Sequence, residues 1–251
     1  MSNDLILQSV KTQQIIDLFD LISGVLFWIK DRDGRVVHCN TVFAEHVGYK
    51  SIARVVGKSD LDLFPPYIAK QFMIDDQKIM AGENITNRLE MNLHKTGELI
   101  WYTTSKRPLI DEAGKIFGTY GITQNLQEMI NTRSGMDKIK KPVEFIKNSF
   151  AQDITVEQLA DVAHLSVSAL ERRFKKYLDK TPKMLIREVR LENARRLLIE
   201  TSFPVAEIAH LSGYTSHSYF SHDFKIMFSI LPSKYRQNVF SSNKLNIEID
   251  V

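Results

Sequence analysis

Cysteine is nearly absent from this chain of 251 residues, which holds Cys39 as its single thiol. One thiol cannot form a disulfide within the chain, so a disulfide-stabilised secreted fold is excluded and a reducing compartment is favoured. Long apolar runs are also missing, since none approaches the roughly 20 residues of a membrane helix. The start, Met1–Asp4, lacks the basic and apolar stretches of a signal peptide. We therefore expect a cytoplasmic protein with no membrane partner.

The sequence has no arrangement of residues typical of a catalytic or metal site. It contains no glycine-rich phosphate loop, no zinc-ligand spacing, and no Ser or Cys nucleophile with a base at a recognisable spacing. His38, His46 and His94 lie at spacings that form no ligand motif, so we expect ordinary surface histidines. These absences argue against an enzyme and against a bound metal.

Four aspartates in the N-terminal half invite comparison with a cation site. Asp60 and Asp62 more simply cap turns or helices, because aspartate side chains accept hydrogen bonds from backbone amides at helix starts. Asp75 and Asp76 are expected to face solvent. We therefore expect no cation between these residues.

The net charge of +3 is small but unevenly distributed. Residues 1–130 hold 14 Lys and Arg against 16 Asp and Glu, residues 131–142 hold four against one, and residues 143–240 hold 14 against 11. The basic excess therefore lies in the C-terminal half. This asymmetry suits a nucleic-acid-binding module joined to a domain with another task.

The N-terminal half shows the pattern of an α+β fold. Short apolar or alternating runs between turn residues predict strands at 25–29, 35–39, 85–93, 98–109 and 116–124. Helical periodicity and capping residues predict helices at 12–22, 41–47 and 66–81. The helix at 12–22 carries an apolar stripe of Ile15, Leu18, Phe19 and Ile22. This order predicts a five-stranded antiparallel sheet with helices on one face.

Residues 24–125 resemble a PAS domain. The resemblance rests on the turn Lys30–Arg35, the segment Gly57–Pro65 and the strand Gly118–Ile122, in this order and spacing. It implies a cytosolic sensory module that holds a small ligand or cofactor between sheet and helices, or that serves for dimerisation. One departure lies at the exit of the domain, where the family often has Asp-Ile-Thr and this chain has Gln124-Asn125-Leu126.

Aromatic residues of this half are the candidates for a ligand pocket. They line a pocket or fill a closed core, and the sequence leaves both alternatives open. The candidates are Trp28, Phe43, Phe64, Phe72, Trp101 and Tyr120, with Ser105 and Tyr120 as groups that could orient a ligand. Cys39 lacks the surroundings of a light-driven flavin adduct, so we expect a small strand residue there. We expect no covalent cofactor, and a small-molecule effector is the interpretation for this half.

The C-terminal half contains one pattern twice, at residues 156–175 and 205–225. Ala160 of the first copy matches Ala209 of the second. Each copy predicts a short helix, a tight turn and a second helix that starts after a Ser cap. Two tandem helix-turn-helix units predict an all-α domain whose partner is double-stranded DNA.

Residues 143–238 resemble the DNA-binding domain of the AraC/XylS family. Besides the two repeats, the resemblance rests on the connector Arg190–Leu198 and on the terminal segment Pro232–Arg236. It implies a connecting helix that holds the two units at a fixed separation. Two recognition helices held about 34 Å apart can enter successive major grooves on one face of DNA.

The two expected recognition helices, at 167–178 and 217–228, carry the candidates for DNA contact. These are Ser168, Glu171, Arg172, Lys175 and Lys176 on the first helix, and His217, Ser218, Ser221 and His222 on the second. The resemblance places Ser168 and Arg172 at base-reading positions. Arg172 can pair bidentately with guanine, while the lysines suit phosphates.

Three positions depart from the family. His164 and Ser229 stand in turns where the family usually has glycine, and His222 stands where it often has arginine. A side chain at a left-handed turn costs stability. A neutral histidine offers fewer hydrogen-bond donors than arginine, so the second unit is expected to bind more weakly or to read other bases.

The sequence thus predicts a one-component transcription regulator of the activator kind. We expect an N-terminal helix at 1–23, a PAS sensor at 24–125, a linker at 126–142, an AraC-type domain at 143–240 and a tail at 241–251. Expected partners are promoter DNA, RNA polymerase, a small-molecule effector and a second copy of the chain that docks through the 12–22 helix. The alternatives are a PAS core that carries a redox, gas or light-sensing cofactor, and a ligand-free PAS scaffold that dimerises constitutively.

Overall fold

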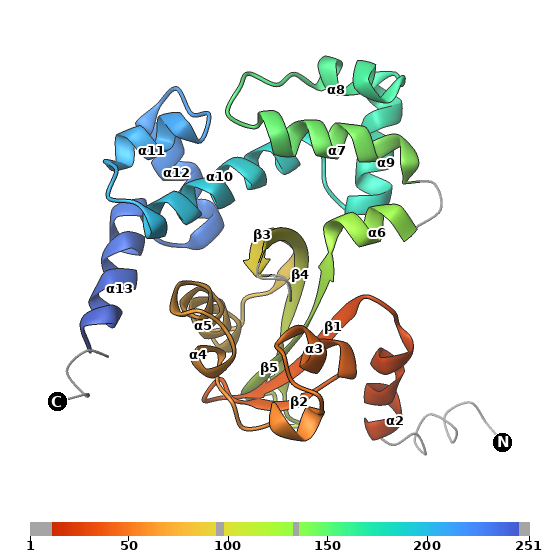
Figure 1. The fold of residues 1–251 in the computed structure, drawn as a ribbon, viewed down its shortest axis with the longest axis vertical. Helices are drawn as coiled ribbons and strands as arrows, with labels where there is room; N and C mark the ends of the chain where they lie inside the picture. The colour runs from red at the N-terminus through yellow and green to blue at the C-terminus, as the bar shows by residue number, and fades with distance from the viewer. Residues whose placement is uncertain (1–11, 94–97, 133–135, 246–251) are drawn as a thin grey trace. The chain divides into compact units, whose positions relative to one another are not determined.

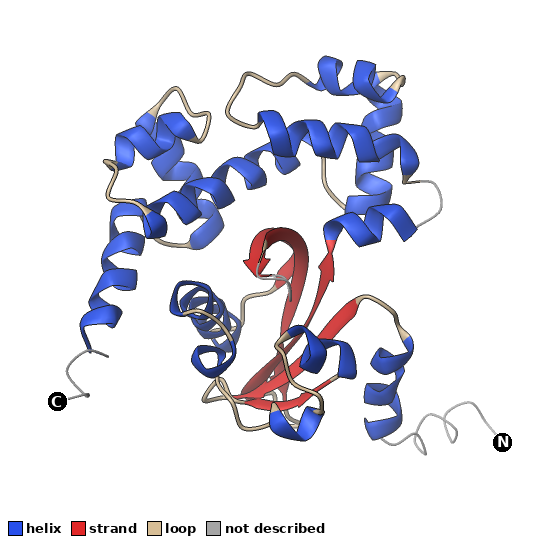
Figure 2. Ribbon diagram, in the orientation of Figure 1, coloured by secondary structure: helices blue, strands red, loops and turns tan. Residues whose placement is uncertain are grey.

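The computed structural model describes residues 12–93, 98–132 and 136–245 (Figure 1). The chain divides into two compact units, Met1–Met129 and Ile130–Val251. Figure 2 shows that all the described strands lie in the first unit and that the described part of the second unit is helical. This division agrees with the predicted order of an α+β half followed by an all-α half.

A five-stranded antiparallel sheet is the framework of the first unit. Its strands are β1 Val25–Asp31, β2 Val36–Cys39, β3 Ile85–Leu93, β4 Leu99–Ile110 and β5 Ile116–Asn125. They lie in the order β2-β1-β5-β4-β3, and each neighbouring pair is antiparallel. The first strand therefore lies beside the last, and the predicted sheet is confirmed.

Helices of the first unit pack against this sheet. They are α3 Thr41–His46, α4 Asp60–Leu63 and α5 Pro66–Met80, with a short 3-10 turn, η2, at Ile52–Arg54. Helix α3 contacts β1, and α5 contacts β3, β4 and β5. Asp62 accepts hydrogen bonds from the backbone nitrogen (2.8 Å) and the hydroxyl (2.7 Å) of Ser59 at the start of α4. Asp62 therefore caps a helix, as the sequence predicted.

The segment before the sheet is helical for a shorter stretch than predicted. Helix α2 covers Thr12–Asp17, and the chain then tightens into the 3-10 helix η1, Leu18–Leu21. Phe19 stacks on Phe27 of β1 with ring centroids 3.9 Å apart. Ile15 and Leu18 are more than half exposed, at 53% and 54%. The apolar stripe is therefore divided between one residue that packs on the sheet and others that face outward.

Asn40 ties the N-terminal segment to the sheet. Its amide oxygen accepts hydrogen bonds from the backbone nitrogens of Phe27 and Phe43, both at 3.0 Å. Its amide nitrogen donates to the carbonyls of Val25 at 2.7 Å and Phe19 at 3.0 Å. These four bonds use both donors and the acceptor oxygen of the side chain. Asn40 thus caps α3 and also fixes η1 and β1.

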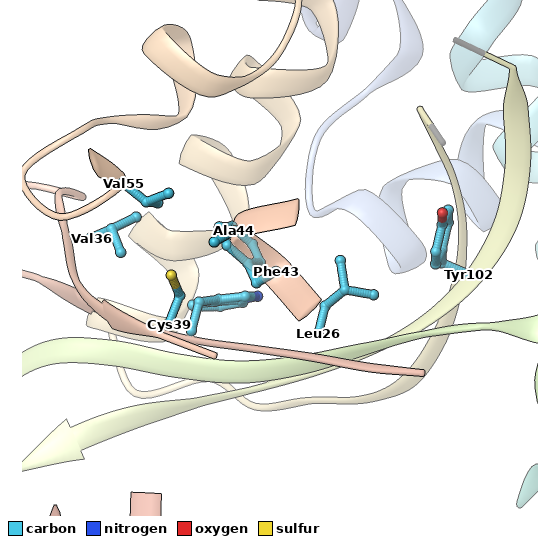
Figure 3. Packing of buried hydrophobic residues seen from close by; sticks show 8 residues of the cluster. Leu26, Val36, Cys39, Phe43, Ala44, Val55 and Tyr102 are labelled. Atoms are coloured by element: carbon cyan, nitrogen blue, oxygen red, sulfur yellow. The ribbon is translucent and has the colours of Figure 1, made fainter. Parts of the chain in front are cut away.

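Buried side chains between the sheet and α3 form the core of this unit (Figure 3). The cluster consists of Leu26, Trp28, Val36, Cys39, Phe43, Ala44, Val55 and Tyr102. Cys39 is fully buried in it, and burial raises the pKa of its thiol to about 12. The thiol is therefore a packing group at ordinary pH, as expected for a small strand residue.

The second unit is built from successive helices. These are α7 Asp137–Ser149, α8 Val156–Ala163, α9 Val167–Leu178, α10 Pro182–Glu200, α11 Val205–Leu211, α12 His217–Phe228 and α13 Pro232–Leu245. Pairs α8–α9 and α11–α12 are the two helix-turn-helix units, and α10 connects them. Leu170, Phe174 and Leu178 form the buried face of α9. Phe220, Phe224 and Phe228 do the same for α12, so both predicted core faces are confirmed.

The stretch between the halves contains more helix than the linker interpretation implied. Helix α6 covers Leu126–Thr132, and α7 starts at Asp137, so that Pro142 lies inside α7 rather than at its start. The amide oxygen of Asn125 accepts hydrogen bonds from the backbone nitrogens of Gln127 (2.8 Å) and Glu128 (3.2 Å). Asn125 therefore caps the exit helix at the position where the family often has a different motif.

Candidate DNA-binding surface and sensor cavity

The two candidate recognition helices begin and end where the sequence predicted. The Ser166 hydroxyl accepts a hydrogen bond from the Ala169 nitrogen at the start of α9, and the Ser216 hydroxyl accepts one from the Tyr219 nitrogen at the start of α12, both at 3.3 Å. Each cap satisfies an amide that would otherwise have no partner within the helix. Local signals therefore suffice to place both helices.

The residues predicted to contact DNA lie on the outer surfaces of these helices. Eight of them are exposed, and Ser221 is partly buried. The exposed set is Ser168, Glu171, Arg172, Lys175, Lys176, His217, Ser218 and His222. Lys175 also forms an exposed ion pair with Asp179, 2.5 Å between Nζ and Oδ1. Since DNA phosphates would compete with such an exposed pair, it does not block the role predicted for Lys175.

The turns after α8 and α12 adopt the left-handed backbone expected at the departures from the family, and so does the turn after α9. His164 has a φ of 52° and Ser229 a φ of 59°, and Asp179, which the sequence did not single out, has a φ of 55°. In the second helix-turn-helix unit, the residue that corresponds to His164 is Gly213, with a φ of 80°. Non-glycine residues tolerate this conformation at a cost in stability.

Arg190 of α10 joins the two helix-turn-helix units directly. Its Nε donates to the carbonyl of Phe150 at 2.8 Å, and its Nη2 donates to the carbonyl of Gln152 at 2.7 Å, both in the loop before α8. The same guanidinium lies 6.0 Å from the ring centroid of Tyr214, which follows α11. A Cβ on Gly213 would lie 2.8 Å from the Phe150 carbonyl oxygen. The second helix-turn-helix unit therefore touches the loop before the first one at Gly213, beside the connecting helix.

A second buried contact fixes the far end of α10. Arg195 donates to both carboxylate oxygens of Glu192, at 2.9 and 2.6 Å, and lies 3.5 Å from the Tyr235 hydroxyl of α13. Both charged groups are almost completely buried. Pairing compensates the cost of burying these charges, and it attaches α13 to the connecting helix.

The first unit contains a small cavity between the sheet and helices α3, α4 and α5. Four of the predicted aromatic residues line it, namely Trp28, Phe43, Phe64 and Phe72. Its other lining residues are Leu26, Lys30, His46, Asp60, Glu90, Asn92, Thr104, Lys106 and Thr123. The free volume is about 30 Å³, which is space for about two water molecules.

The structure does not bring Trp101, Ser105 and Tyr120 to this cavity. Successive side chains of a strand point to opposite faces of a sheet. Thr104 and Lys106 of β4 line the cavity, so Trp101 and Ser105 lie on the other face. Thr123 of β5 also lines it, so Tyr120, three residues earlier, lies on the other face as well. The structure therefore places these three residues apart from the cavity that the other four line.

A chain of buried ion pairs runs along the polar wall of the cavity. The Lys30 ammonium donates to both oxygens of Asp60, at 2.7 and 2.6 Å, and to Asp76 at 2.7 Å. The Lys106 ammonium donates to the other oxygen of Asp76 at 2.9 Å. Asp75 and Asp76 are 0% and 8% exposed. The expectation that they face solvent is wrong, because the lysines of β1 and β4 pair with acids from α4 and α5.

The same network continues along β3 and β4. Arg88 pairs with both oxygens of Asp75 and, at 2.8 Å, with Glu90. Glu90 in turn accepts a 2.6 Å hydrogen bond from the Thr104 hydroxyl. That hydroxyl lies 2.9 Å from the hydroxyl of Thr123 on β5. Buried charges are thus paired throughout this wall.

Burial and pairing shift the titration of these groups in opposite directions. Burial by itself would raise the pKa of Asp75, but the Arg88 and Lys106 charges lower it to about 2. Burial would lower the pKa of Lys30, but the Asp76 and Asp60 carboxylates raise it above its ordinary value. Burial raises the pKa of Asp60 despite the opposing charge of Lys30.

Sequence reasoning missed the charged residues of this cavity, although one signal was present. Lys30 stands two residues after Trp28, and Lys106 stands two after Thr104, so strand alternation places each lysine on the inward face. Among the residues described, no cluster of His, Cys, Asp and Glu has the arrangement of a metal site. No described helix is long and apolar enough to cross a membrane.

Comparison with known proteins identifies both halves. Residues 19–130 match the PAS fold, and residues 159–238 match a helix-turn-helix domain. The xylose operon regulatory protein of Escherichia coli K12 is 37% identical over 94 residues, which are 38% of this chain and 24% of that protein. The HTH-type transcriptional activator RhaS of Pectobacterium carotovorum is 24% identical over 233 residues, which are 89% of this chain and 80% of that protein.

Solved structures include a similar domain. The C-terminal domain of AraT, a response regulator from Geobacillus stearothermophilus, is 32% identical, with a TM-score of 0.40, and the match covers 41% of this chain and 85% of that one. The chain spans about a quarter of the length of the xylose regulator that it matches. The family matches and the sequence relatives together show that this chain carries a PAS fold followed by a helix-turn-helix domain of the AraC type.

Proposed function

We propose that this protein is a transcription regulator that binds promoter DNA through α9 and α12. The observation that carries the proposal is the pair of capped helices that expose polar and basic residues, held by one connecting helix. Arg190 and Gly213 add a direct contact between the two helix-turn-helix units. A rigid pair of recognition helices suits adjacent major grooves on one face of DNA.

Arg172 has the role of a base-reading residue in this proposal, and Ser168 supports it on the same exposed surface of α9. A bidentate arginine–guanine contact contributes about 1–3 kcal/mol of discrimination against the wrong base. Lys175 and Lys176 contact phosphates, which fix the position of the protein without reading sequence. On α12, the exposed groups are His217, Ser218 and His222, with Ser221 beside them.

The PAS unit supplies control in this proposal. A small molecule in the cavity favours one state of the unit and thereby changes DNA affinity, by no more than its difference in binding energy between the two states. The protein acts in the cytoplasm as a homodimer and contacts RNA polymerase. The outward-facing Ile15, Leu18, Leu21 and Ile22 supply an apolar surface for a second copy.

The size of the cavity favours a small effector over the cofactor-bearing alternative. A free volume of about 30 Å³ does not accommodate a flavin or haem ring unless the wall opens. An absorbance scan of the purified protein separates the alternatives, because a bound flavin or haem absorbs visible light. A ligand-free dimerising scaffold would show neither visible absorbance nor an effect of any small molecule on DNA affinity.

The test of the DNA-binding proposal compares two variants on two DNAs. A target site is first selected from a random-sequence pool with the full-length protein, and binding is then measured on that site and on unrelated DNA. We expect Arg172→Ala to weaken binding to the selected site about 10- to 100-fold and to affect unrelated DNA much less. Lys176→Ala is the control and should weaken binding to both DNAs by a similar factor.

Two results would contradict this assignment. An equal loss on both DNAs for Arg172→Ala would make Arg172 a phosphate contact. A random pool from which the protein enriches no sequence would contradict sequence-specific DNA binding altogether.

A further inference from the structure

The cavity of the PAS unit holds a buried ammonium group with unused hydrogen-bond donors. Lys106 is 2% exposed and lines the cavity. An ammonium group has three N–H donors, yet within the described part of the chain Lys106 Nζ donates a single hydrogen bond, to Asp76 at 2.9 Å. Lys30, by contrast, donates three, to Asp60 and Asp76. Lys106 is therefore the lysine that can still donate to a ligand.

The surroundings of Lys106 show where such a ligand would lie. Its Nζ is 5.1 Å from the ring centroid of Trp28 and 5.3 Å from that of Phe72. Both rings line the cavity together with Phe43 and Phe64. A hydrogen-bonding group aimed at Lys106 therefore has an apolar, aromatic environment for the rest of its molecule. Planar aromatic ligands suit such walls, because aromatic rings pack favourably in offset-stacked or edge-to-face arrangements.

Hydroxyl groups beside Lys106, on β4 and the adjacent strand β5, offer an acceptor. The Thr104 hydroxyl gives its proton to Glu90. Because each hydroxyl has one proton, the 2.9 Å contact between Thr104 and Thr123 requires that Thr123 donate. The Thr123 oxygen therefore keeps lone pairs that can accept from a ligand. The cavity thus offers donors at Lys106 and an acceptor at Thr123.

The charges of the wall select against an ionic ligand. Two cations and two anions line the cavity, namely Lys30, Lys106, Asp60 and Glu90, and each has a partner of opposite charge within 3 Å. A carboxylate or ammonium on the ligand would enter a site with no net countercharge, and burying an uncompensated charge is costly. An uncharged molecule meets no such cost.

We propose that this cavity binds a small, uncharged, planar molecule whose hydroxyl, carbonyl or ring nitrogen accepts a hydrogen bond from Lys106. The inference rests on the ligand-binding role proposed for the PAS unit and names the chemistry of its effector. A donor group on the same molecule bonds to the Thr123 hydroxyl oxygen. The free volume of about 30 Å³ is smaller than an aromatic ring requires, so the side chains of the wall move apart when the ligand enters, and a small ring needs less movement than a large one.

Three isosteric probes of different charge test the proposal on the full-length protein. Benzamide is neutral, benzoate is an anion and benzamidine is a cation, and all three have one shape. The chain has two tryptophans, so Trp101→Phe leaves Trp28, in the cavity wall, as the single reporter of tryptophan fluorescence. The titrations are made at pH 8.

We expect a saturable change of Trp28 fluorescence with benzamide, at a Kd at least tenfold lower than for benzoate or benzamidine. Lys106→Met, which keeps the length of the side chain and removes its donors, should weaken benzamide binding at least tenfold. Lys115→Met, at an exposed lysine of the same unit, is the matched control and should bind as the parent does. Thermal melting establishes that each variant is folded.

Thr123→Val keeps the inference testable if Lys106→Met does not fold. This nearly isosteric change removes the acceptor and should weaken benzamide binding while thermal unfolding remains cooperative. Equal or tighter binding of benzoate, the absence of saturable binding of all three probes, or parental affinity in a folded Lys106→Met variant would overturn the proposal. The titration contains no DNA, so its failure and a failure of the DNA-binding proposal are distinguished.

Discussion

Asp75 carries much of the pH dependence of stability in the PAS unit. Its pKa is held at about 2 by Arg88 and Lys106, below the value of about 3.9 for an unfolded chain. A lowered folded-state pKa stabilises the fold above the unfolded value, and this contribution is lost as pH falls from about 4 towards 2. Its size is about 2 kcal/mol. We therefore expect the free energy of unfolding in urea to decrease across this range.

The Asp75→Asn variant tests this assignment. It removes the titrating group and leaves Arg88 with Glu90 alone, so we expect a lower free energy of unfolding at pH 7, by about 3 kcal/mol, and a smaller loss between pH 4 and 2. Asp153→Asn, at an exposed position, is the control. An unchanged pH dependence in Asp75→Asn would show that other carboxyl groups control acid unfolding.

Cys39 gives a second prediction at the scale of a single residue. Its side chain is fully buried, and its pKa of about 12 leaves almost no thiolate at pH 8. Because the thiolate is the reactive form, a thiol reagent should label the native protein far more slowly than the protein unfolded in urea. Equal rates of labelling would contradict the buried position of β2.

At the scale of elements, local signals determined what could be predicted from the sequence. The bounds of α9 and α12 follow from a Ser cap and a periodic apolar face, both within about 15 residues of sequence. The cavity wall was missed because its partners are distant, as in the pair of Lys30 with Asp76, 46 residues apart. From sequence alone, an aspartate on a helix is predicted to be exposed. The buried lysine that pairs with it lies on a strand far away in the sequence, so the pair is not visible before the fold is known.

The contact between the two helix-turn-helix units provides the prediction for α10. Arg190→Ala removes two hydrogen bonds to loop carbonyls and should lower the free energy of unfolding by about 1–3 kcal/mol. The matched control is Arg196→Ala on the same helix, whose exposed ion pair with Glu200 contributes about 0.5 kcal/mol or less. Equal effects of the two substitutions would contradict a joining role for Arg190.

A DNA-binding measurement also tests the contact that Arg190 makes with the loop before α8. A folded Arg190→Ala variant should lose affinity for a selected site that engages both units more than for a site in which the half read by α12 has been replaced. Similar losses on both sites would mean that α10 alone sets the separation of the recognition helices.

For the whole molecule, the apolar surface of the N-terminal segment predicts self-association. Leu18 and Leu21 are 54% and 80% exposed. We expect the double substitution Leu18→Lys and Leu21→Lys to shift the protein from dimer to monomer in size-exclusion chromatography with light scattering. Val37→Lys, at an exposed apolar residue of β2, is the control. A dimer that survives the double substitution would place the interface elsewhere.

In the proposed function, one chain reads DNA with two recognition helices on one face of the duplex. Hydroxyl-radical footprinting of the full-length protein, on a site selected from a random-sequence pool, tests it most directly. We predict two protected tracts whose centres lie about one helical turn, 10–10.5 base pairs, apart on the same face of the duplex. A single protected tract would contradict the use of both units, and the absence of protection on any enriched sequence would contradict the function itself.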